Sequence, residues 1–334
     1  MLKGGFILPK KCNVSVVIPL YNKEKYIERS ITSVLSQTHN YFEIIVVNDG
    51  STDGGPEKVA EIKDDRIRIL TQDNLGESAA RNKGISEAKY ELIAFLDADD
   101  QWEPEFLENC VRIAEKFPDI GMIGVAFKII APKEKIIYPQ YKYVPVEEGV
   151  IEDFFKAAFK RDPVCSSSVV VRKEVFVNLG GFTVGLRYGA DTFMWIKIAF
   201  NYQVYFIKKF LAVVYENADN RVLDTYRNIE YAPLIENIRY LDKVIDGGKN
   251  YYLNEYIYGT YLCLAKRCMR TGDKKNLKLL LSKAKPTRAY KIDYRLFKIA
   301  LYIPYPVFKI MYGIWRKLKI YQPHFLLNAL NFWF

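Results

Sequence analysis

The sequence predicts an α/β fold in which a mostly parallel central sheet is flanked by helices and followed by a helical appendage. Two observations predict it. Short apolar runs rich in β-branched residues alternate four times with segments of helical periodicity, which is the pattern of a doubly wound sheet. Beyond about residue 216 the strand signal fades into Tyr-rich, basic sequence. We therefore expect an N-terminal extension over residues 1–11, an α/β domain over residues 12–216 and a helical C-terminal region over residues 217–334.

The first strands are expected where apolar runs end at polar turns. Val14–Ile18, stopped by Pro19, is typical of a strand buried on both faces, and Asn22 can cap the helix that follows. Three further strands are predicted, over residues 43–47, 66–70 and 92–96. Ligands of such sheets bind outside the carboxyl ends of the strands. The residues directly after each run are therefore candidates for function.

The remaining elements follow from periodicity and turn residues. Apolar positions at helical spacing predict the helices, and Pro104 is compatible with the first turn of one of them. Helices are expected up to about residue 63 and over residues 76–88, 103–117, 152–159 and 191–200, and strand-like segments over residues 122–130 and 166–171.

The net charge of +10 is unevenly distributed. Residues 1–200 hold 26 Lys and Arg against 29 Asp and Glu, whereas residues 201–334 hold 23 against 10. The first part is typical of a neutral globular domain. The second part favours contact with an anionic partner such as nucleic acid, membrane headgroups or a phosphorylated substrate. Because the basic stretch shows no nucleic-acid reader motif, we expect no nucleic acid partner.

The compartment is predicted from the N-terminus and the cysteines. Residues 1–11 are too short and too poor in apolar side chains for a secretory signal, so a cytoplasmic protein is expected. The five cysteines are scattered, form no C-x-x-C pair and have only two histidines to help them hold zinc. Buried, reduced thiols are therefore the favoured interpretation.

An acidic cluster follows the strand that ends at Leu96. Asp97, Asp99 and Asp100 stand within four positions, and like charges at a strand end cost stability unless a cation is bound. Mg²⁺ and Mn²⁺ prefer carboxylate and phosphate oxygens, so the cluster indicates a metal–diphosphate site. The alternative left open by the spacing is a solvated loop in which Asp100 helps to start the next helix.

Two other polar positions each have a functional and an ordinary interpretation. Asp49 can accept hydrogen bonds from a base or ribose, or it can belong to a turn whose residues 51–53 cap a helix. Arg81 can reach a phosphate with its permanently charged fork, or it can be a solvated helical arginine. Taken singly, Asp49 favours the turn, and a solvated helical residue is the ordinary alternative for Arg81.

Four ordered segments carry a resemblance to a known family. Val-Ser-Val-Val-Ile-Pro-Leu-Tyr-Asn, Val-Val-Asn-Asp-Gly-Ser-Thr-Asp, Gly-Glu-Ser-Ala-Ala-Arg-Asn-Lys-Gly and Phe-Leu-Asp-Ala-Asp-Asp resemble the motifs of family 2 glycosyltransferases with the GT-A fold, in the same order and spacing. The resemblance covers roughly residues 12–216. It implies inverting transfer of a sugar from a nucleotide-diphospho-sugar, with uridine as the usual base.

The resemblance also assigns the donor site. Tyr21 would lie beside the base and Asp49 would hydrogen-bond it. Asp99 would hold the Mn²⁺ or Mg²⁺ that bridges the diphosphate, and Asp97 would meet ribose or metal. The residues that the resemblance assigns to the donor nucleotide are Pro19, Tyr21, Asp49, Arg81 and Asp97.

A general base is expected after a Gly-Gly-Phe segment. By the resemblance, Asp191 stands where the Asp of a Glu-Asp pair would be, following Gly180-Gly181-Phe182, while Ala190 replaces the usual Glu. Asp191 would take the proton of the acceptor hydroxyl, and the metal would stabilise the leaving diphosphate. The alternative is that Asp191 is a plain N-cap of the helix through Trp195.

The C-terminal region bears on which class of acceptor the protein uses. Residues 299–315 are aromatic and apolar, but Pro304, Pro306 and Lys309 interrupt them, and spanning a bilayer takes about 20 apolar residues. With Arg and Lys following, this stretch suits the surface of an anionic membrane, or it packs on the catalytic domain or a second subunit. Membrane contact would favour a lipid-linked saccharide acceptor, a peripheral location at the inner face of the cell membrane and a role in cell-surface polysaccharide synthesis.

Three other functions compete with this one. A processive synthase should carry membrane spans and a Gln-x-x-Arg-Trp motif, and Gln203 and Gln322 lack such partners, so transfer of one sugar at a time is favoured. A sugar nucleotidyltransferase should show a Gly-rich basic loop after the first strand, where this chain has Pro19-Leu20-Tyr21-Asn22-Lys23. A non-catalytic sugar-nucleotide sensor or scaffold is suggested only by Ala190.

Overall fold

The computed structural model describes residues 12–159, 161–186, 189–216, 218–219, 237, 239–243, 251–285, 291–307 and 310–311. The expected N-terminal extension, residues 1–11, lies outside them. The chain divides into two compact units. The first comprises residues 1–152 and 163–237, and the second comprises residues 153–162 and 238–334.

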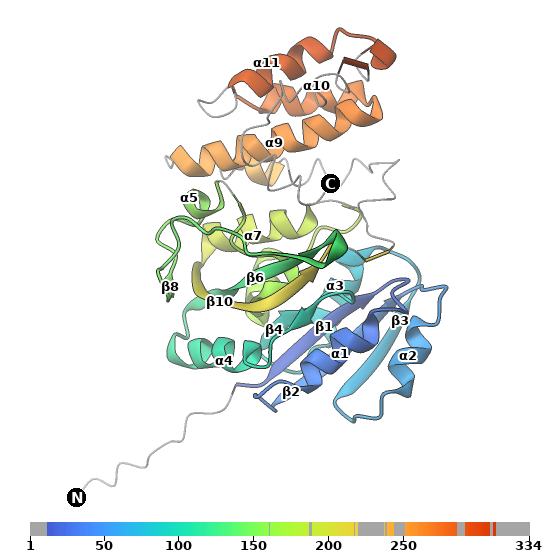
Figure 1. Ribbon diagram of the computed structural model, residues 1–334. Helices are drawn as coiled ribbons and strands as arrows, with labels where there is room; N and C mark the ends of the chain where they lie inside the picture. The colour runs from blue at the N-terminus through green and yellow to red at the C-terminus, as the bar shows by residue number, and fades with distance from the viewer. Residues whose placement is uncertain are drawn as a thin grey trace, which may run out of the picture. The chain divides into compact units, whose positions relative to one another are not determined.

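The first unit is built on one sheet of ten strands in the order β3-β2-β1-β4-β9-β6-β10-β5, with β7 beside β6 and β8 beside β10 (Figure 1). The strands are β1 Val14–Leu20, β2 Phe42–Asp49, β3 Ile67–Gln72, β4 Leu92–Phe95, β5 Gln101–Trp102, β6 Ile120–Ala131, β7 Lys135–Ile137, β8 Glu148–Val150, β9 Val169–Arg172 and β10 Gln203–Tyr215. Strands β3, β2, β1 and β4 run parallel. This confirms the doubly wound half predicted from the alternating pattern.

The other half of the sheet is mixed. β9 is antiparallel to both β4 and β6, whereas β10 runs parallel to β6. The register of β10 shifts between Ile207 and Phe210 and again before Ala212. These irregularities fall at the pair Lys208-Lys209, which interrupts the apolar pattern, and explain why no separate strand is predicted there. The predicted strand over residues 166–171 was wrong in its first half, since Ser166–Ser168 form a 3₁₀ turn.

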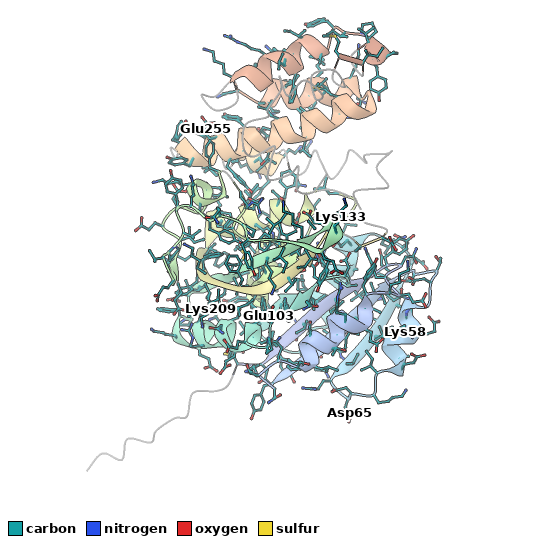
Figure 2. All side chains as sticks on the ribbon, viewed as in Figure 1. Lys58, Asp65, Glu103, Lys133, Lys209 and Glu255 are labelled. Carbon is teal, nitrogen blue, oxygen red and sulfur yellow. The ribbon has the colours of Figure 1, made fainter. Side chains whose placement is uncertain are left out.

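Six α-helices and one further 3₁₀ turn, Pro132–Glu134, complete the described part of this unit. The helices are α1 Ile27–Leu35, α2 Gly55–Glu61, α3 Glu77–Glu87, α4 Phe106–Lys116, α6 Lys173–Leu179 and α7 Ala190–Asn201. They flank the sheet (Figure 1). Figure 2 shows the side chains on this ribbon, and apolar strand residues such as Val16, Ile45 and Phe95 are fully buried. Close packing of α3 on β1 requires a glycine, because a Cβ at Gly84 would lie 2.3 Å from Cγ1 of Val17.

Neither α1 nor α2 has a side-chain cap bond at its N-cap residue, although Asp53, one residue before the N-cap of α2, accepts from the N–H of Gly55 at 3.1 Å. α1 begins after Tyr26 without a side-chain cap, and Asn22 adopts a positive φ of 51°. Its Oδ1 accepts a hydrogen bond from the backbone N–H of Thr52 at 2.8 Å. Gly54 occupies the start of α2, while Asp53 accepts from the N–H of Glu24 at 2.9 Å. These polar side chains therefore join the turns after β1 and β2.

The second unit contains helices α5 Phe154–Ala158, α9 Tyr251–Thr271, α10 Lys274–Lys283 and α11 Lys291–Ala300. The ring of Phe155 lies 5.8 Å from that of Tyr256, and the hydroxyl of Tyr256 donates to Asp162. Residues 153–162 thus pack on α9. Among the described residues, no helix combines the length and the apolar character needed to cross a bilayer.

Candidate active site

Three of the predicted site residues lie at the carboxyl ends of adjacent parallel strands. Tyr21 follows β1, Asp49 ends β2, and Asp97 comes two residues after β4. Because β1 pairs with β2 on one side and β4 on the other, these positions share one edge of the sheet. Pro19 lies inside β1, buried and paired with Val47, whereas the side chain of Tyr21 is exposed.

Asp49 is engaged with the chain that leads into α3. Its Oδ1 accepts from Nε2 of Gln72 at 2.7 Å and from the N–H of Leu75 at 2.9 Å, and its Oδ2 accepts from the N–H of Gly76 at 2.9 Å. The residue is 3% exposed. Asp49 therefore fixes the start of α3, and only lone pairs that these three bonds leave are available to a ligand.

Arg81 joins two carboxylates at the same edge. Its Nη2 donates to Glu77 and to Oδ1 of Asp97 at 2.8 Å, and the guanidinium lies 5.4 Å from the ring centre of Phe182. Its Nε is buried without a hydrogen-bond partner. The arginine is 4% exposed in its side chain, so the interpretation as a solvated helical residue was wrong.

Burial and crowding of negative charge act on this cluster together. Burial raises the pKa of Asp97, Arg81 opposes the shift, and the charges of Asp99 and Asp191 add to it. Asp191 therefore lies within electrostatic reach of the acidic cluster.

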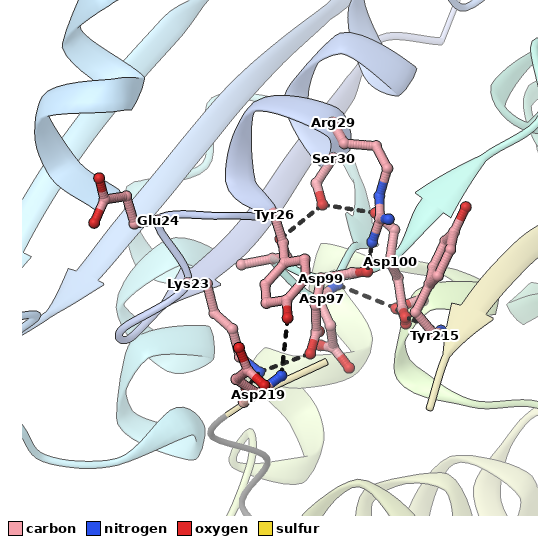
Figure 3. A network of polar contacts seen from close by, with 12 residues as sticks. Lys23, Glu24, Tyr26, Arg29, Ser30, Asp97, Asp99, Asp100, Tyr215 and Asp219 are labelled. Atoms are coloured by element: carbon pink, nitrogen blue, oxygen red, sulfur yellow. Dashed lines mark hydrogen bonds and ion pairs between the residues drawn. The ribbon is translucent and has the colours of Figure 1, made fainter. Parts of the chain in front are cut away.

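Asp99 is held from two sides (Figure 3). Its Oδ2 forms an ion pair with Nζ of Lys23 at 2.7 Å, and its backbone carbonyl accepts from Nη2 of Arg29. The guanidinium of Arg29 lies 3.6 Å from the ring centre of Tyr215. Side chains from the turn after β1, from α1 and from β10 thus position this carboxylate.

Asp100 is a buried structural residue, which corrects the alternative that it starts the next helix. Glu105 occupies the N-cap of α4. Asp100 is 4% exposed and accepts from Oγ of Ser167 at 2.6 Å and from the N–H of Tyr215 at 2.9 Å. Burial, with the negative charges of Asp99 and Asp97, raises its pKa well above the ordinary range. Its contacts tie the acidic loop to the second half of the sheet.

Asp191 lies in the first turn of α7, whose N-cap is Gly189. The alternative that Asp191 is the N-cap was therefore wrong. Its Oδ1 accepts from the N–H of Thr192 at 2.8 Å. The buried Ala190 begins the helix at the position where the resemblance places a Glu.

The Gly-Gly-Phe segment is fixed by the neighbour of Arg81. Asn82 donates from Nδ2 to the carbonyl of Phe182 at 2.8 Å and accepts from its N–H at 2.9 Å. Gly181 has a φ of 67°, and a Cβ there would lie 2.7 Å from Oδ1 of Asn82. Phe182 in turn packs edge-on against Trp195 of α7. This chain of contacts sets α7, and with it Asp191, relative to α3.

The donor chemistry of the edge fits a hard divalent cation. No group of three or more His, Cys, Asp or Glu side chains in the described part of the chain is arranged to hold a metal by itself. The side chain of Asp99, in the acidic loop after β4, is 15% exposed and offers carboxylate oxygens as ligands. One carboxylate combined with diphosphate oxygens is a usual ligand set for Mg²⁺. Asp99 and Asp97 are the residues that would hold it.

Several site residues were not singled out from the sequence. Lys23, Glu77 and Ser167 contact the predicted site residues Asp99, Arg81 and Asp97 directly, whereas Asn82 bonds Phe182. Glu77 and Asn82 stand within the quoted Gly-Glu-Ser-Ala-Ala-Arg-Asn segment, where helical spacing of four between Glu77 and Arg81 could have suggested their pairing. Lys23 and Ser167 carry no local signal, because their partners are 76 and 70 residues away in sequence.

Comparison with known proteins indicates the same family that the sequence motifs resemble, the family 2 glycosyltransferases. Residues 15–175 match the family model described as Glycosyl transferase family 2. A glycosyltransferase of Nostoc, alr2836, of uncharacterised function, is 42% identical over 115 residues, which are 34% of this chain and 35% of that protein. TuaG of Bacillus subtilis, provisionally named a teichuronic acid biosynthesis glycosyltransferase, is 42% identical over 99 residues, or 29% of this chain and 39% of its own.

The fold has a solved counterpart. The crystal structure of S. aureus TarS 1-349 in complex with UDP-GlcNAc superposes with a TM-score of 0.68 at 17% identity, covering 87% of this chain and 89% of that one. The sheet and its acidic edge define the GT-A class of α/β fold. Residues 15–175 are, by sequence, a family 2 glycosyltransferase domain, and the matches span 35% and 39% of the two curated relatives described.

Proposed function

We propose that this protein is an inverting glycosyltransferase that moves one sugar from a nucleotide-diphospho-sugar to a hydroxyl group of a saccharide acceptor. The observation that carries the proposal is that Asn82 of α3 bonds Phe182, which packs on Trp195 and so sets α7, with Asp191 in its first turn, relative to the helix whose Arg81 pairs with Asp97. A carboxylate base and a site for a charged leaving group are the two parts that such a displacement needs.

The proposed reaction forms one bond to the anomeric carbon and breaks another. The acceptor oxygen attacks the anomeric carbon while the bond from that carbon to the phosphate oxygen breaks. Asp191 takes the proton of the acceptor hydroxyl, and the electron pair of the broken bond leaves with the nucleoside diphosphate. Because attack and departure occur in one step on opposite sides of the carbon, the configuration inverts.

The nucleotide would be held by the residues at the strand ends. Arg81 has a buried Nε with no hydrogen-bond partner and a permanent charge, and Tyr21 offers an exposed ring for the base. Asp97 and Asp99 would hold Mn²⁺ or Mg²⁺. When bound, such an ion neutralises the charge that develops on the leaving diphosphate.

The donor and acceptor classes are drawn from similar proteins. TarS was crystallised with UDP-GlcNAc and with UDP, which supports a UDP-sugar donor. The name of TuaG supports a role in synthesis of a cell-surface polysaccharide. A lipid-linked saccharide is the proposed acceptor, and transfer of one sugar per encounter is the proposed mode.

Contact with an anionic membrane surface is proposed for the end of the second unit. Ile299, Tyr302 and Ile310 are large apolar side chains that are 55%, 87% and 65% exposed. Exposed aromatic and aliphatic groups near basic residues are suited to the interfacial zone. Tyr305, also expected at the membrane, lies over Gly272 instead, and Phe308, Tyr312, Trp315, Arg316, Lys317 and Lys319 lie outside the described residues.

The reaction itself is tested by product analysis. The full-length protein is incubated with UDP-sugars, Mn²⁺ and a panel of lipid-linked saccharides, and the anomeric configuration of the product is read by NMR. We expect a β-linked product from an α-linked donor and release of UDP. Retention of configuration would exclude a single displacement. Nucleotide binding without transfer to any acceptor would favour the sensor or scaffold alternative.

A further inference from the structure

The turn between β1 and α1 presents Lys23 to the acidic edge. The carbonyl of Lys23 accepts from the N–H groups of Tyr26 at 2.9 Å and Ile27 at 3.0 Å, which fixes the backbone of this turn. Nζ of Lys23 then lies 2.7 Å from Oδ2 of Asp99, with side chains only 11% and 15% exposed. This is a largely buried contact and differs from the exposed surface pairs that contribute little to stability.

A second oxygen holds the same ammonium. Nζ of Lys23 also donates to the backbone carbonyl of Asp219 at 2.7 Å. Lys25 donates to Oδ2 of Asp219 at 2.7 Å, and the N–H of Asp219 donates to the hydroxyl of Tyr26 at 3.0 Å. Figure 3 shows this network around Asp99. The turn over residues 23–26 therefore contacts the amide, the carbonyl and the carboxylate of Asp219. These contacts fix Lys23 as the cation that pairs with Asp99.

A divalent cation that bound Oδ2 of Asp99 would lie close to the ammonium of Lys23 on the same oxygen. Two positive charges at contact distance from one oxygen repel strongly where solvent is largely excluded. The lysine ammonium sits on a flexible stem of four carbons and is not tied to one geometry as a guanidinium is. A diphosphate offers more negative charge and more acceptor oxygens than the carboxylate that Lys23 would leave.

We propose that Lys23 exchanges partners when the donor binds. In the empty enzyme Lys23 neutralises Asp99 and occupies the place of the metal, and in the donor complex it yields Asp99 to the cation and binds the diphosphate. The inference rests on the proposed function. Lys23 would thus disfavour metal binding in the absence of nucleotide and favour nucleotide binding in the presence of metal.

The two halves of this proposal predict opposite effects of one substitution. Lys23→Met keeps an unbranched side chain that is one atom shorter and removes its charge. Binding of Mn²⁺ alone, followed by the EPR signal of the free ion, should become about tenfold tighter than in the wild type, because the competing ammonium is gone. Binding of UDP at saturating Mn²⁺, followed by calorimetry, should become about tenfold weaker.

Two further variants separate this role from a structural one. Lys23→Arg retains the charge and should bind UDP more tightly than Lys23→Met. Lys58→Met, which removes a 42% exposed ammonium on α2 that pairs with Glu61, should leave both affinities unchanged. Damage to the local structure would weaken both ligands, and thermal unfolding of each variant checks that the fold is retained.

The outcomes distinguish this inference from the proposed function. Unchanged affinity of Lys23→Met for Mn²⁺ alone would overturn the competition, and unchanged affinity for UDP would overturn the transfer to the diphosphate. If the wild type binds no nucleotide under any condition, the proposed function fails. The comparison of Mn²⁺ affinities between the wild type and Lys23→Met still tests whether Lys23 competes with the cation for Asp99.

Discussion

At the scale of single residues, charge balance organises the acidic edge. Arg81 contacts Glu77 and Asp97, and Lys23 contacts Asp99. Asp97 and Asp99 therefore each carry a cationic partner even without a ligand, so the acidic cluster does not require a metal to be stable. The proposed reaction requires that a metal ion and a nucleotide replace these cationic partners.

The base assigned to Asp191 is testable by one isosteric change. Asp191→Asn removes the proton acceptor and keeps the size of the side chain, so turnover should fall by about 10²- to 10⁴-fold. Affinity for the UDP-sugar should stay within a factor of about two, since Asp191 is assigned to the acceptor side. Initial rates and calorimetric titration measure the two quantities.

The exposed Asp119, which precedes β6, supplies the matched control. Asp119→Asn should leave both turnover and affinity as in the wild type. A fully active Asp191→Asn variant would remove Asp191 from the mechanism, and a variant that no longer binds the donor would move it to the nucleotide site.

How much of the site could be predicted differs from residue to residue. Asp49, Asp97 and Asp99 were identified because strand ends and motif order are local in sequence. The burial of Arg81 and Asp100 could not be predicted, since it depends on Phe182, Ser167 and Tyr215, which belong to distant elements. Lys23 looked like an ordinary basic residue of a turn because its partners lie far along the chain.

At the scale of elements, the 3₁₀ turn Ser166–Ser168 ties the acidic loop to the rest of the sheet. Oγ of Ser167 donates to Oδ2 of Asp100 and accepts from the N–H of Asp97 at 3.1 Å, and its carbonyl accepts from Nε1 of Trp102 at 2.7 Å. The serine is fully buried. It connects the loop after β4 with the strand β9 that reverses direction beside it.

Removal of this hydroxyl should be costly. Ser167→Ala leaves a buried carboxyl oxygen and a backbone N–H without partners, and each such loss typically destabilises by about 1–3 kcal/mol. We expect the free energy of unfolding in urea to fall by about 2–4 kcal/mol in total. Ser86→Ala, at an exposed hydroxyl that donates to the carbonyl of Lys83, should change it by less than about 0.5 kcal/mol. Equal effects of the two changes would contradict the role given to Ser167.

The predicted elements succeeded where patterns are regular and failed where the sheet departs from them. β1, β2 and β4 are continuous apolar runs between polar turns and were predicted within a few residues. β10 was not identified as a separate strand because its irregular register breaks the alternation of its side chains. The antiparallel insertion of β9 depends on pairing with β4 and β6, which no local pattern reports.

At the scale of the whole molecule, charge and structure divide along the chain. The neutral first part folds around the sheet, and helices α9, α10 and α11 build the basic second unit. Residues 153–162 come from within the first part of the sequence but belong to the second unit. A single boundary near residue 216 does not place residues 153–162 in the second unit. The sequence of a short helix does not indicate the unit on which the helix packs.

Membrane contact is a property of the second unit and is tested by flotation. The full-length protein should float with vesicles containing anionic lipid and sediment with neutral ones, and raised salt should release it because surface charge is screened. A truncation at about residue 290 removes Ile299, Tyr302 and Ile310 and should abolish flotation. A truncated protein that still floats would exclude this stretch as the contact.

The acidic edge is proposed to bind a nucleotide-sugar through a metal held by Asp99. The most direct measurement is thermal unfolding of the wild type and Asp99→Asn with a panel of nucleotide-sugars, each with and without Mn²⁺, since a ligand of the native state must stabilise it. We predict that a UDP-sugar with Mn²⁺ raises the unfolding temperature of the wild type, and that omission of Mn²⁺ or the Asp99→Asn change removes most of this increase. Stabilisation that is equal with and without Mn²⁺, or equal in both proteins, would contradict the claim.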